Sequence, residues 1–238
     1  MRLMKIEALY EDAVLLAVNK PAGLLAVPDR WDKAKDNLVA LLQADRPGQH
    51  LANVHRLDKN TSGVFLLAKN ADAFRRLARQ FRQRQTRKLY LALVHGDING
   101  RERVIDQPIG PDRKRPGFSR IDPRGKSARS LLRVREQFRG FALVEVEIES
   151  GRHHQVRVHC QQIGHPLVGD LDYGGKPLLL SQLKRGYKMK LGEPERPLMA
   201  RPALHAASVV LVEPSVTITA PLPKDFEVAL KYLRKFAV

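Results

Sequence analysis

A carboxylate stands at the centre of the first segment whose residue types suggest chemistry. This segment runs from His55 to Gly63 (HRLDKNTSG) and places Asp58 two residues after an arginine and three residues before Thr-Ser-Gly. It leads into the apolar run Val64–Ala68, which predicts a buried strand. Loops anchored on strands are common positions for reactive groups. The alternative is an Asx turn, in which the carboxylate only caps the backbone near Thr61, and local physics taken alone favours that turn.

Two further segments place polar side chains among apolar ones. Arg87–Gly96 contains Tyr90, whose phenol is either a core ring with a satisfied hydroxyl or a surface that stacks against a base. Gly151–His159 (GRHHQVRVH) contains Arg157, which in a helix shares a face with His154. A guanidinium on such a face can hold a carboxylate through two parallel hydrogen bonds and keep it ionised.

The histidines near the third segment raise the question of a metal centre. No two of them have the HExxH spacing, the chain has a single cysteine, and the arginines among them would repel a divalent ion. The sequence therefore predicts no metal site, and a metal-dependent nuclease stays open only as an alternative that chelation would reveal. The candidate ligands are His153, His154, His159, Cys160 and His165.

The charge of the chain predicts a polyanionic partner. Its 238 residues include 42 Lys+Arg against 25 Asp+Glu, for a formal net charge of +17. A basic balance of this size is typical of nucleic-acid binding. The apolar runs are too short to span a bilayer, and no signal peptide is visible. Aromatic residues make up only 6%, which favours a pocket for one base over a platform of stacked bases.

The elements that would position these segments are mostly strands. Strands outnumber helices and most connections are short, so we expect an α+β fold with a mixed, largely antiparallel β-sheet and flanking helices. A basic strand (Arg129, Arg133, Arg135) should pair with an acidic one (Glu145, Glu147, Glu149). The expected strands are Ile6–Tyr10, Val14–Asn19, Val64–Ala68, Lys88–His95, Ala128–Glu136, Phe141–Glu149, Leu204–Val212 and Val216–Thr219. The expected helices are one capped by Asp36 that runs through Leu42, then Ala71–Arg82, His153–Ile163 and one that starts at Asp225.

Two basic regions are candidates for phosphate contact. The helix Ala71–Arg82 is expected to bury a stripe of Phe74, Leu77, Ala78 and Phe81 and to turn its arginines outward. Phosphate contact and a purely solubilising role are equally open for these arginines. Ser181–Pro202 is rich in Lys, Arg, Gly and Pro and is expected to be an exposed basic insertion. The candidate contacts are Arg75, Arg76, Arg79 and Arg82 on the helix and Lys184, Arg185, Lys188 and Lys190 in the insertion.

Together these segments resemble the RluA-type pseudouridine synthases, which modify ribosomal and transfer RNA. The pattern HRLDxxTSG is complete from His55 to Gly63, Lys-x-Tyr matches at Lys88 and Tyr90, and GRxHQxRxH matches from Gly151 to His159. Asn19–Gly23 (NKPAG) and the late Leu204-His205-Ala206 are also similar to that family. A nine-residue loop motif with ordered companions is far more specific than any single short pattern.

The resemblance implies a pseudouridine synthase fold with a central catalytic cleft, and isomerisation of uridine in structured RNA without a cofactor. By resemblance Asp58 is the catalytic carboxylate and Arg157 its ion-pair partner. Tyr90 would pack against the uracil, Val156 would form an apolar wall, and Arg56 would fill the space left by the flipped base or contact phosphate. Whether Asp58 attacks ribose C1′, attacks uracil C6 or removes the C2′ proton is left open.

The resemblance also bears on organisation. We expect one catalytic domain over residues 1–238 with 181–202 as an insertion, and no separate N-terminal RNA-binding domain, although many relatives carry one. We further expect a monomer in the cytoplasm, with ribosomal or transfer RNA as partner, no membrane association and no obligatory protein partner. A catalytically silent RNA-binding protein is the other alternative. The intact Asp58, Tyr90 and Arg157 argue against it, because plain binding has no use for a carboxylate that repels phosphate.

Overall fold

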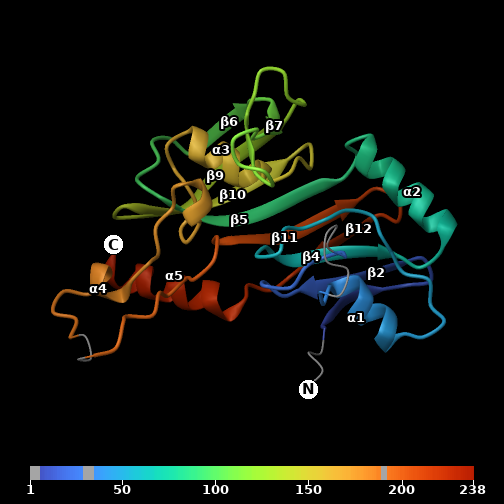
Figure 1. The fold of residues 1–238 in the computed structure, drawn as a ribbon, viewed down its shortest axis with the longest axis horizontal. Helices are drawn as coiled ribbons and strands as arrows, with labels where there is room; N and C mark the ends of the chain where they lie inside the picture. The colour runs from blue at the N-terminus through green and yellow to red at the C-terminus, as the bar shows by residue number, and fades with distance from the viewer. Residues whose placement is uncertain (1–5, 29–34, 189–191) are drawn as a thin grey trace. The chain divides into compact units, whose positions relative to one another are not determined.

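The computed structural model describes residues 6–28, 35–188 and 192–238, and the chain divides into two compact units. The first unit contains the residues up to Leu89 together with His205–Pro221. The second contains Tyr90–Leu204 and Leu222–Val238. The chain passes between the units within strands β5 (Arg87–His95) and β11 (Leu204–Leu211), both labelled in Figure 1, and again between Pro221 and Leu222.

The first unit is built on a mixed sheet. Its strands follow the order β1-β2-β4-β11, while β12 pairs with β11 and β3 pairs with β4. The β4–β11 pairing is parallel, and the pairings of β1 with β2, β2 with β4, β3 with β4 and β11 with β12 are antiparallel. The bounds of these strands are Ala8–Glu11 (β1), Leu15–Lys20 (β2), Ala52–Asn53 (β3), Ser62–Ala68 (β4) and Val216–Thr219 (β12). The helices of the unit are α1 (Leu38–Asp45) and α2 (Ala71–Arg82).

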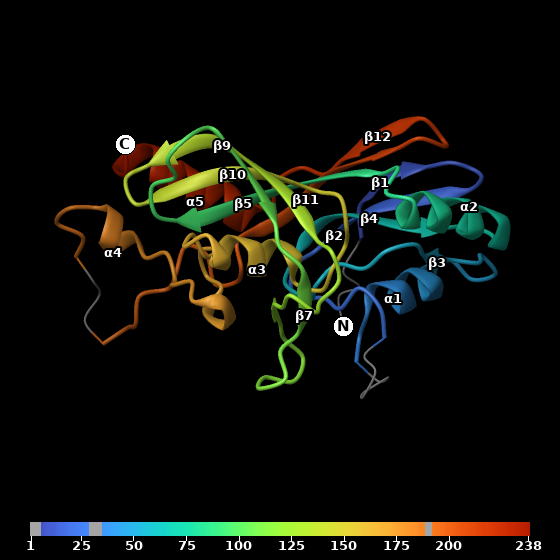
Figure 2. The same ribbon diagram turned by 90° about the horizontal axis from the view of Figure 1, so that it is seen from above.

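The second unit has a sheet covered on both faces. Its strands follow the order β5-β10-β9-β6, with β10 and β6 both antiparallel to β9. Leu93 of β5 joins a core cluster that contains residues of helix α5, while Ala92 and Val94 join a second cluster with residues of helix α3. The two helices accordingly lie on opposite sides of these strands (Figures 1 and 2). The bounds are Glu102–Asp106 (β6), Ile109–Pro111 (β7), Ser119–Ile121 (β8), Arg129–Phe138 (β9), Phe141–Ile148 (β10), Gln155–Gln162 (α3), Leu171–Tyr173 (the 3-10 helix η1), Leu180–Leu183 (α4) and Lys224–Phe236 (α5).

The expected α+β class and the charged strand pair are both confirmed. Arg129 pairs with Glu149 at 3.2 Å, and Arg135 pairs with Glu145 at 2.5 Å. Arg133 lies between carboxylates of β6 and β10. These cations of β9 are neutralised inside their own sheet, so they are poor candidates for phosphate contact. Among the helices of the described ranges, none combines the length and apolar character needed to cross a bilayer.

Three local expectations were wrong. The α1 cap is Asn37 and not Asp36, because the Asn37 side chain accepts the Ala40 N–H at 3.0 Å. Helix α3 begins at Gln155 and not at His153, because His154 adopts a left-handed conformation with φ 56°.

The third difference concerns α2, whose arginines are exposed as expected but whose buried stripe is rotated. The buried residues are Ala73, Leu77 and Gln80, whereas Phe74 is 39% exposed. The Gln80 side chain accepts the N–H groups of Val212 and Glu213, at 3.1 and 3.2 Å, in the turn between β11 and β12. The spacing of apolar residues does not predict a buried polar residue such as Gln80.

Candidate active site

The loop that carries Asp58 is held by a buried lysine. Lys20, at the end of β2, is 0% exposed and donates from Nζ to the carbonyl oxygens of Pro21, Lys59 and Thr61, at 2.9, 2.9 and 2.8 Å. Three acceptors match the three N–H donors of an ammonium group, so its burial is compensated. The clamp fixes the main chain one and three residues after Asp58 and explains why the NKPAG segment accompanies the loop motif.

The end of the motif is fixed by the parallel pairing of β4 with β11. Ser62 lies opposite His205 and Gly63 opposite Ala206. His205 Nε2 lies 3.3 Å from the Ala220 carbonyl and must donate to it, so His205 Nδ1 accepts the Ser62 hydroxyl at 2.9 Å. Gly63 has φ +113°, and a Cβ there would lie 2.1 Å from the Ala206 carbonyl oxygen. Only glycine fits this close approach of two backbones.

The first residue of the motif, His55, joins the loop to β4. Its Nε2 accepts the Leu66 N–H at 3.0 Å, and its ring stacks on Phe81 with centroids 5.2 Å apart. Burial lowers the pKa of His55 from 6.5 to about 3, with a smaller contribution from the Lys88 ammonium. His55 is therefore neutral near pH 7 and serves as a structural acceptor, not as an acid–base group.

The lowered pKa of His55 predicts a pH dependence of stability. Below about pH 6.5 the imidazole of His55 takes up a proton in the unfolded chain, whereas in the folded chain it does so only near pH 3. The contribution of His55 to the free energy of unfolding therefore decreases as the pH falls. The free energy of unfolding should fall in total by on the order of a few kcal/mol. Denaturant titrations of the wild type and His55→Gln between pH 7 and 4 measure it, because the other groups titrate in both proteins. A stability difference that is constant with pH would contradict this prediction.

Within the loop, neighbouring residues point to different environments. Leu57 is 6% exposed, whereas Arg56 is exposed and Asp58 half-buried. The Thr61 N–H donates to the main-chain carbonyl of Asp58 at 3.1 Å. This main-chain hydrogen bond closes the turn from Asp58 to Thr61. The catalytic role of Asp58 stays a prediction at this point.

In the second unit, Arg157 of α3 is bound by carboxylates that the sequence reasoning missed. Its Nε and Nη2 donate to the two oxygens of Asp170, both at 2.7 Å, and Nη2 also donates to Asp172 at 2.9 Å. The side chain of Arg157 is 7% exposed and that of Asp170 0% exposed. A buried arginine requires a counter-ion, and that requirement was the available signal. Asp58 belongs to the other unit, and its pairing with Arg157 stays a prediction.

Tyr90 and Val156 belong to the same apolar environment. Val156 is 4% exposed in the core cluster on the α3 side of the sheet, and Tyr90 is partly buried against that cluster. The expectation that Tyr90, Ala92 and Val94 share one face of their strand is confirmed. Val156, the residue before Arg157, therefore lies in the cluster against which Tyr90 packs.

Among the possible metal ligands, His153 and His154 stack with ring centroids 3.7 Å apart, while His159 and His165 make separate protein contacts. His159 uses both ring nitrogens, with Nδ1 2.8 Å from the Ser130 hydroxyl and Nε2 3.0 Å from the Gln107 carbonyl. His165 Nδ1 lies 2.9 Å from the His95 carbonyl. Burial raises the pKa of the Cys160 thiol to about 12, which disfavours the thiolate that binds metals. His159 and His165 thus serve in protein hydrogen bonds.

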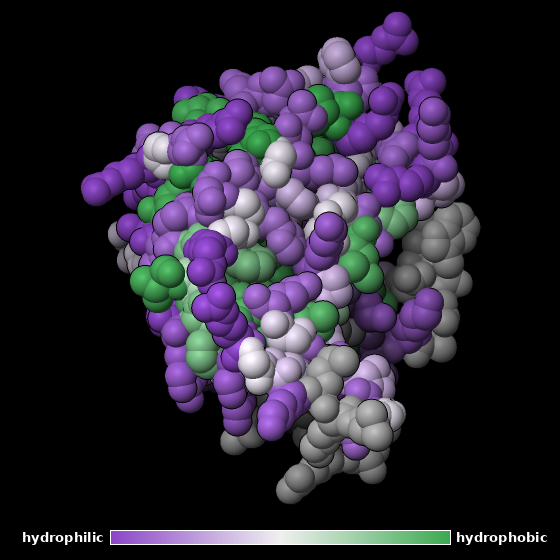
Figure 3. Space-filling view, turned by 90° about the vertical axis from the view of Figure 1, so that its left-hand side faces the viewer, coloured by the Kyte–Doolittle hydropathy of each residue, from purple (hydrophilic) through white to green (hydrophobic). Residues whose placement is uncertain are grey.

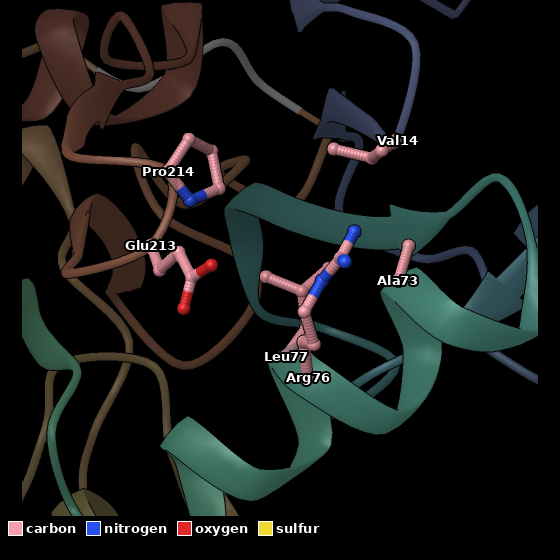
Figure 4. A pocket seen from close by; sticks show the side chains of 6 residues that line it. All are labelled: Val14, Ala73, Arg76, Leu77, Glu213 and Pro214. Atoms are coloured by element: carbon pink, nitrogen blue, oxygen red, sulfur yellow. The ribbon is translucent and has the colours of Figure 1, made fainter.

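The predicted RNA contacts differ in what surrounds them. On α2, Arg75 pairs with Asp72, and Arg76 lines a cavity of about 230 Å³ beside Glu213 (Figure 4). Arg79 and Arg82 are exposed and form no ion pair among the described residues. In the predicted insertion, Lys184, Arg185 and Lys188 are exposed, whereas Lys190 lies outside the described residues.

The fold and the loop motif are those of an isomerase that acts on uridines in RNA. A family model described as RNA pseudouridylate synthase matches residues 14–162. The ribosomal large subunit pseudouridine synthase D of Pseudomonas aeruginosa is 36% identical over 98% of this chain and 73% of its own length. An uncharacterized RNA pseudouridine synthase of Bacillus subtilis, YhcT, is 34% identical over 94% of this chain and 70% of its own length.

Solved structures of RNA pseudouridylate synthase domains have the same fold as this chain. Human RNA pseudouridylate synthase domain containing 4 superposes with a TM-score of 0.72 at 26% identity, covering 96% of this chain and 93% of that one. Human RNA pseudouridylate synthase domain containing 1 gives a TM-score of 0.71 at 28% identity, covering 94% and 86%. The chain belongs to the RNA pseudouridylate synthase family, and its reaction is the isomerisation of uridine in RNA to pseudouridine. The predicted fold, family and enzyme class are confirmed.

Proposed function

We propose that this enzyme modifies uridines of large-subunit ribosomal RNA and that Asp58 is its catalytic carboxylate. The observation that carries the proposal is the loop around Asp58, which is held on both sides of the carboxylate by contacts of its own motif and of Lys20. Lys20 clamps the main chain after the carboxylate, and His55 joins the loop to β4. Relatives at 32–36% identity are named for the large ribosomal subunit, which favours ribosomal over transfer RNA.

The reaction requires an ionised carboxylate near the junction of sugar and base. The bond between N1 and C1′ breaks, the uracil rotates, and C5 bonds to C1′. The proton leaves C5 and N1 ends protonated, so the balance needs no electron and no imported group. Asp58 acts on the sugar or the base, Tyr90 packs against the uracil, and Val156 supplies an apolar wall. Arg56 fills the space that the flipped nucleotide leaves.

In this mechanism Arg157 keeps Asp58 ionised by supplying an opposite charge. Its guanidinium is held by Asp170 and Asp172, so it is oriented before RNA binds. The three routes by which Asp58 could act use the same carboxylate in the same place. Arg157 is accordingly a positioning residue for Asp58 in all of them.

Pseudouridine mapping of total RNA tests the proposal. RNA from cells that lack the enzyme should lose one or a few pseudouridines in the large-subunit ribosomal RNA. Wild-type protein should restore them, and Asp58→Asn should not. Loss confined to transfer RNA would contradict the proposed substrate but not the activity. Restoration by Asp58→Asn would contradict the proposed carboxylate.

Chelation separates this mechanism from metal-dependent chemistry. We expect activity on RNA folded beforehand to be unchanged when excess chelator is added to the enzyme. The physical reason is that the proposed groups are a carboxylate, a phenol and a guanidinium, none of which needs a metal. RNA structure should be monitored in the same samples. Recovery of activity only after zinc or magnesium is returned, with RNA structure unchanged, would favour a metal enzyme.

For RNA affinity, we propose that Arg79 and Arg82 contact phosphates, with Arg75, Lys184 and Arg185 as further contacts. Each phosphate contact changes the slope of log affinity against log salt by about 0.7 for single strands. Arg79→Gln with Arg82→Gln should therefore make the slope shallower by roughly 1 to 1.5. Turnover at saturating RNA should change little.

A matched control removes two arginines that are already neutralised. Arg129→Gln with Arg135→Gln deletes the same charge from β9, where Glu149 and Glu145 are the partners. This control should leave the salt slope unchanged. Equal slopes for the wild type and both double variants would assign the α2 arginines to solubility alone.

For organisation, we propose that the two units act as one catalytic domain in a cytoplasmic monomer without an obligatory protein partner. Within the described ranges, the exposed large hydrophobic residues are Phe74, Val104, Leu171, Val212 and Val238. The face in Figure 3 is mostly hydrophilic, with hydrophobic side chains in small separate groups. Monomeric proteins commonly have such surfaces. A solution mass equal to two chains would contradict this proposal.

A further inference from the structure

A chain of hydrogen bonds in the second unit connects Arg157 to the β7–β8 hairpin. Arg157 Nη1 lies 3.0 Å from His154 Nε2, and His154 Nδ1 lies 2.8 Å from the Tyr173 hydroxyl. That hydroxyl lies 3.0 Å from the Ser119 nitrogen and 3.1 Å from the Ser119 carbonyl oxygen. Ser119 is the first residue of β8.

The proton positions in this chain follow from its two ends. A guanidinium can only donate, so His154 Nε2 accepts from Arg157 and the imidazole proton lies on Nδ1. Nδ1 therefore donates to the Tyr173 oxygen, which also accepts the Ser119 N–H. The Tyr173 O–H donates to the Ser119 carbonyl. Both lone pairs and the proton of the Tyr173 hydroxyl are used, so this hydroxyl joins the hydrogen bonds of His154 to those of Ser119.

Two features indicate that the arrangement is imposed by its surroundings. His154 has φ 56°, a conformation that non-glycine residues adopt uncommonly and that gathers at functional sites. The Tyr173 ring is 0% exposed and lies under the guanidinium of Arg157, with a distance of 4.7 Å to the ring centre. Arg115 of the hairpin adds a second link by donating to the Asp172 carbonyl at 2.9 Å.

We propose that Tyr173 and His154 are positioning residues that set the orientation of Arg157 and couple it to the β7–β8 hairpin. Asp170 and Asp172 hold one edge of the guanidinium, and His154 holds the other. With Tyr173 beneath it, the guanidinium is fixed in its plane and in its rotation. A displacement of Ser119 in the hairpin is transmitted through Tyr173 and His154 to Arg157. The inference rests on the proposed function of Arg157 as the partner of the catalytic carboxylate.

The test uses single-turnover kinetics with the full chain in excess over an RNA that the wild type modifies. The rate constant reports chemistry, while the amplitude reports the active fraction, so partial unfolding is separated from mispositioning. Tyr173→Phe keeps the ring under Arg157 and removes only the hydroxyl. His154→Asn suits the left-handed backbone and removes the imidazole. We expect each to slow the rate constant by about tenfold with little change in RNA affinity, because small misplacements slow reactions strongly.

Matched variants make the result specific. Tyr10→Phe removes a phenol hydroxyl that donates to Asp12 in the first unit and should leave the rate unchanged. If Tyr173 acts through Arg157, the effect of Tyr173→Phe should fall below about twofold in an Arg157→Lys background, which is the non-additivity expected of coupled residues. Additive effects, or wild-type rate constants for both Tyr173→Phe and His154→Asn, would overturn the inference. A wild-type rate constant for Arg157→Lys would instead overturn the proposed function of Arg157.

Discussion

Asp58→Asn is expected to abolish pseudouridine formation and to leave the protein folded. The substitution keeps the shape of the side chain and removes its charge. The Lys20 clamp and the turn from Asp58 to Thr61 both use main-chain carbonyls, so they survive the change. Loss of a positioned catalytic group typically costs about 100- to 10,000-fold, so residual activity should be at least 100-fold below wild type. Nucleoside analysis of treated RNA measures it.

The control for this variant is Asp45→Asn at the exposed end of α1. It removes the same charge from the same unit and should keep full activity. Melting temperatures of the two variants should agree with that of the wild type within a few degrees, because neither position is a core residue. Near wild-type isomerisation by Asp58→Asn would show that another group performs the chemistry.

Arg157→Met is expected to reduce both activity and stability. The side chain of Arg157 is 7% exposed, and its partner Asp170 is fully buried. Removing one member of a buried ion pair leaves the other uncompensated, at a cost of about 3–5 kcal/mol. Activity should fall because Asp58 loses its proposed counter-ion. Denaturant titration and single-turnover kinetics measure the two effects separately.

A second substitution separates the structural from the functional part of this effect. Arg157→Met combined with Asp170→Asn removes the stranded charge as well, so most of the lost stability should return. Activity should not return, since the guanidinium is still absent. If activity recovers together with stability, Arg157 has only a structural task. If Arg157→Met changes neither quantity, the ion pair with Asp170 is unimportant for both.

Local patterns in the chain were sufficient for most of the secondary structure and for the family. Alternation of side chains predicted the β9–β10 pairing and its rows of opposite charge, because period and charge are carried by neighbours in sequence. The motif from His55 to Gly63 identified the loop that carries the carboxylate. The basic composition indicated a polyanionic partner, and the motif resemblance identified it as RNA. These inferences depend on short-range geometry, which a single sequence contains.

Long-range hydrogen bonds and charge compensation were decided only by the tertiary structure. Lys20 reaches carbonyls 39 and 41 residues away, and Gln80 binds a turn about 130 residues further along. Arg157 was predicted to pair with Asp58, but within its own unit it is held by Asp170, a residue that no motif marked. The left-handed backbone of His154 was also decided by the tertiary structure, and it makes helix α3 begin at Gln155 and not at His153. A buried polar group must find a partner wherever the fold brings one, and spacing along the chain does not encode which partner that is.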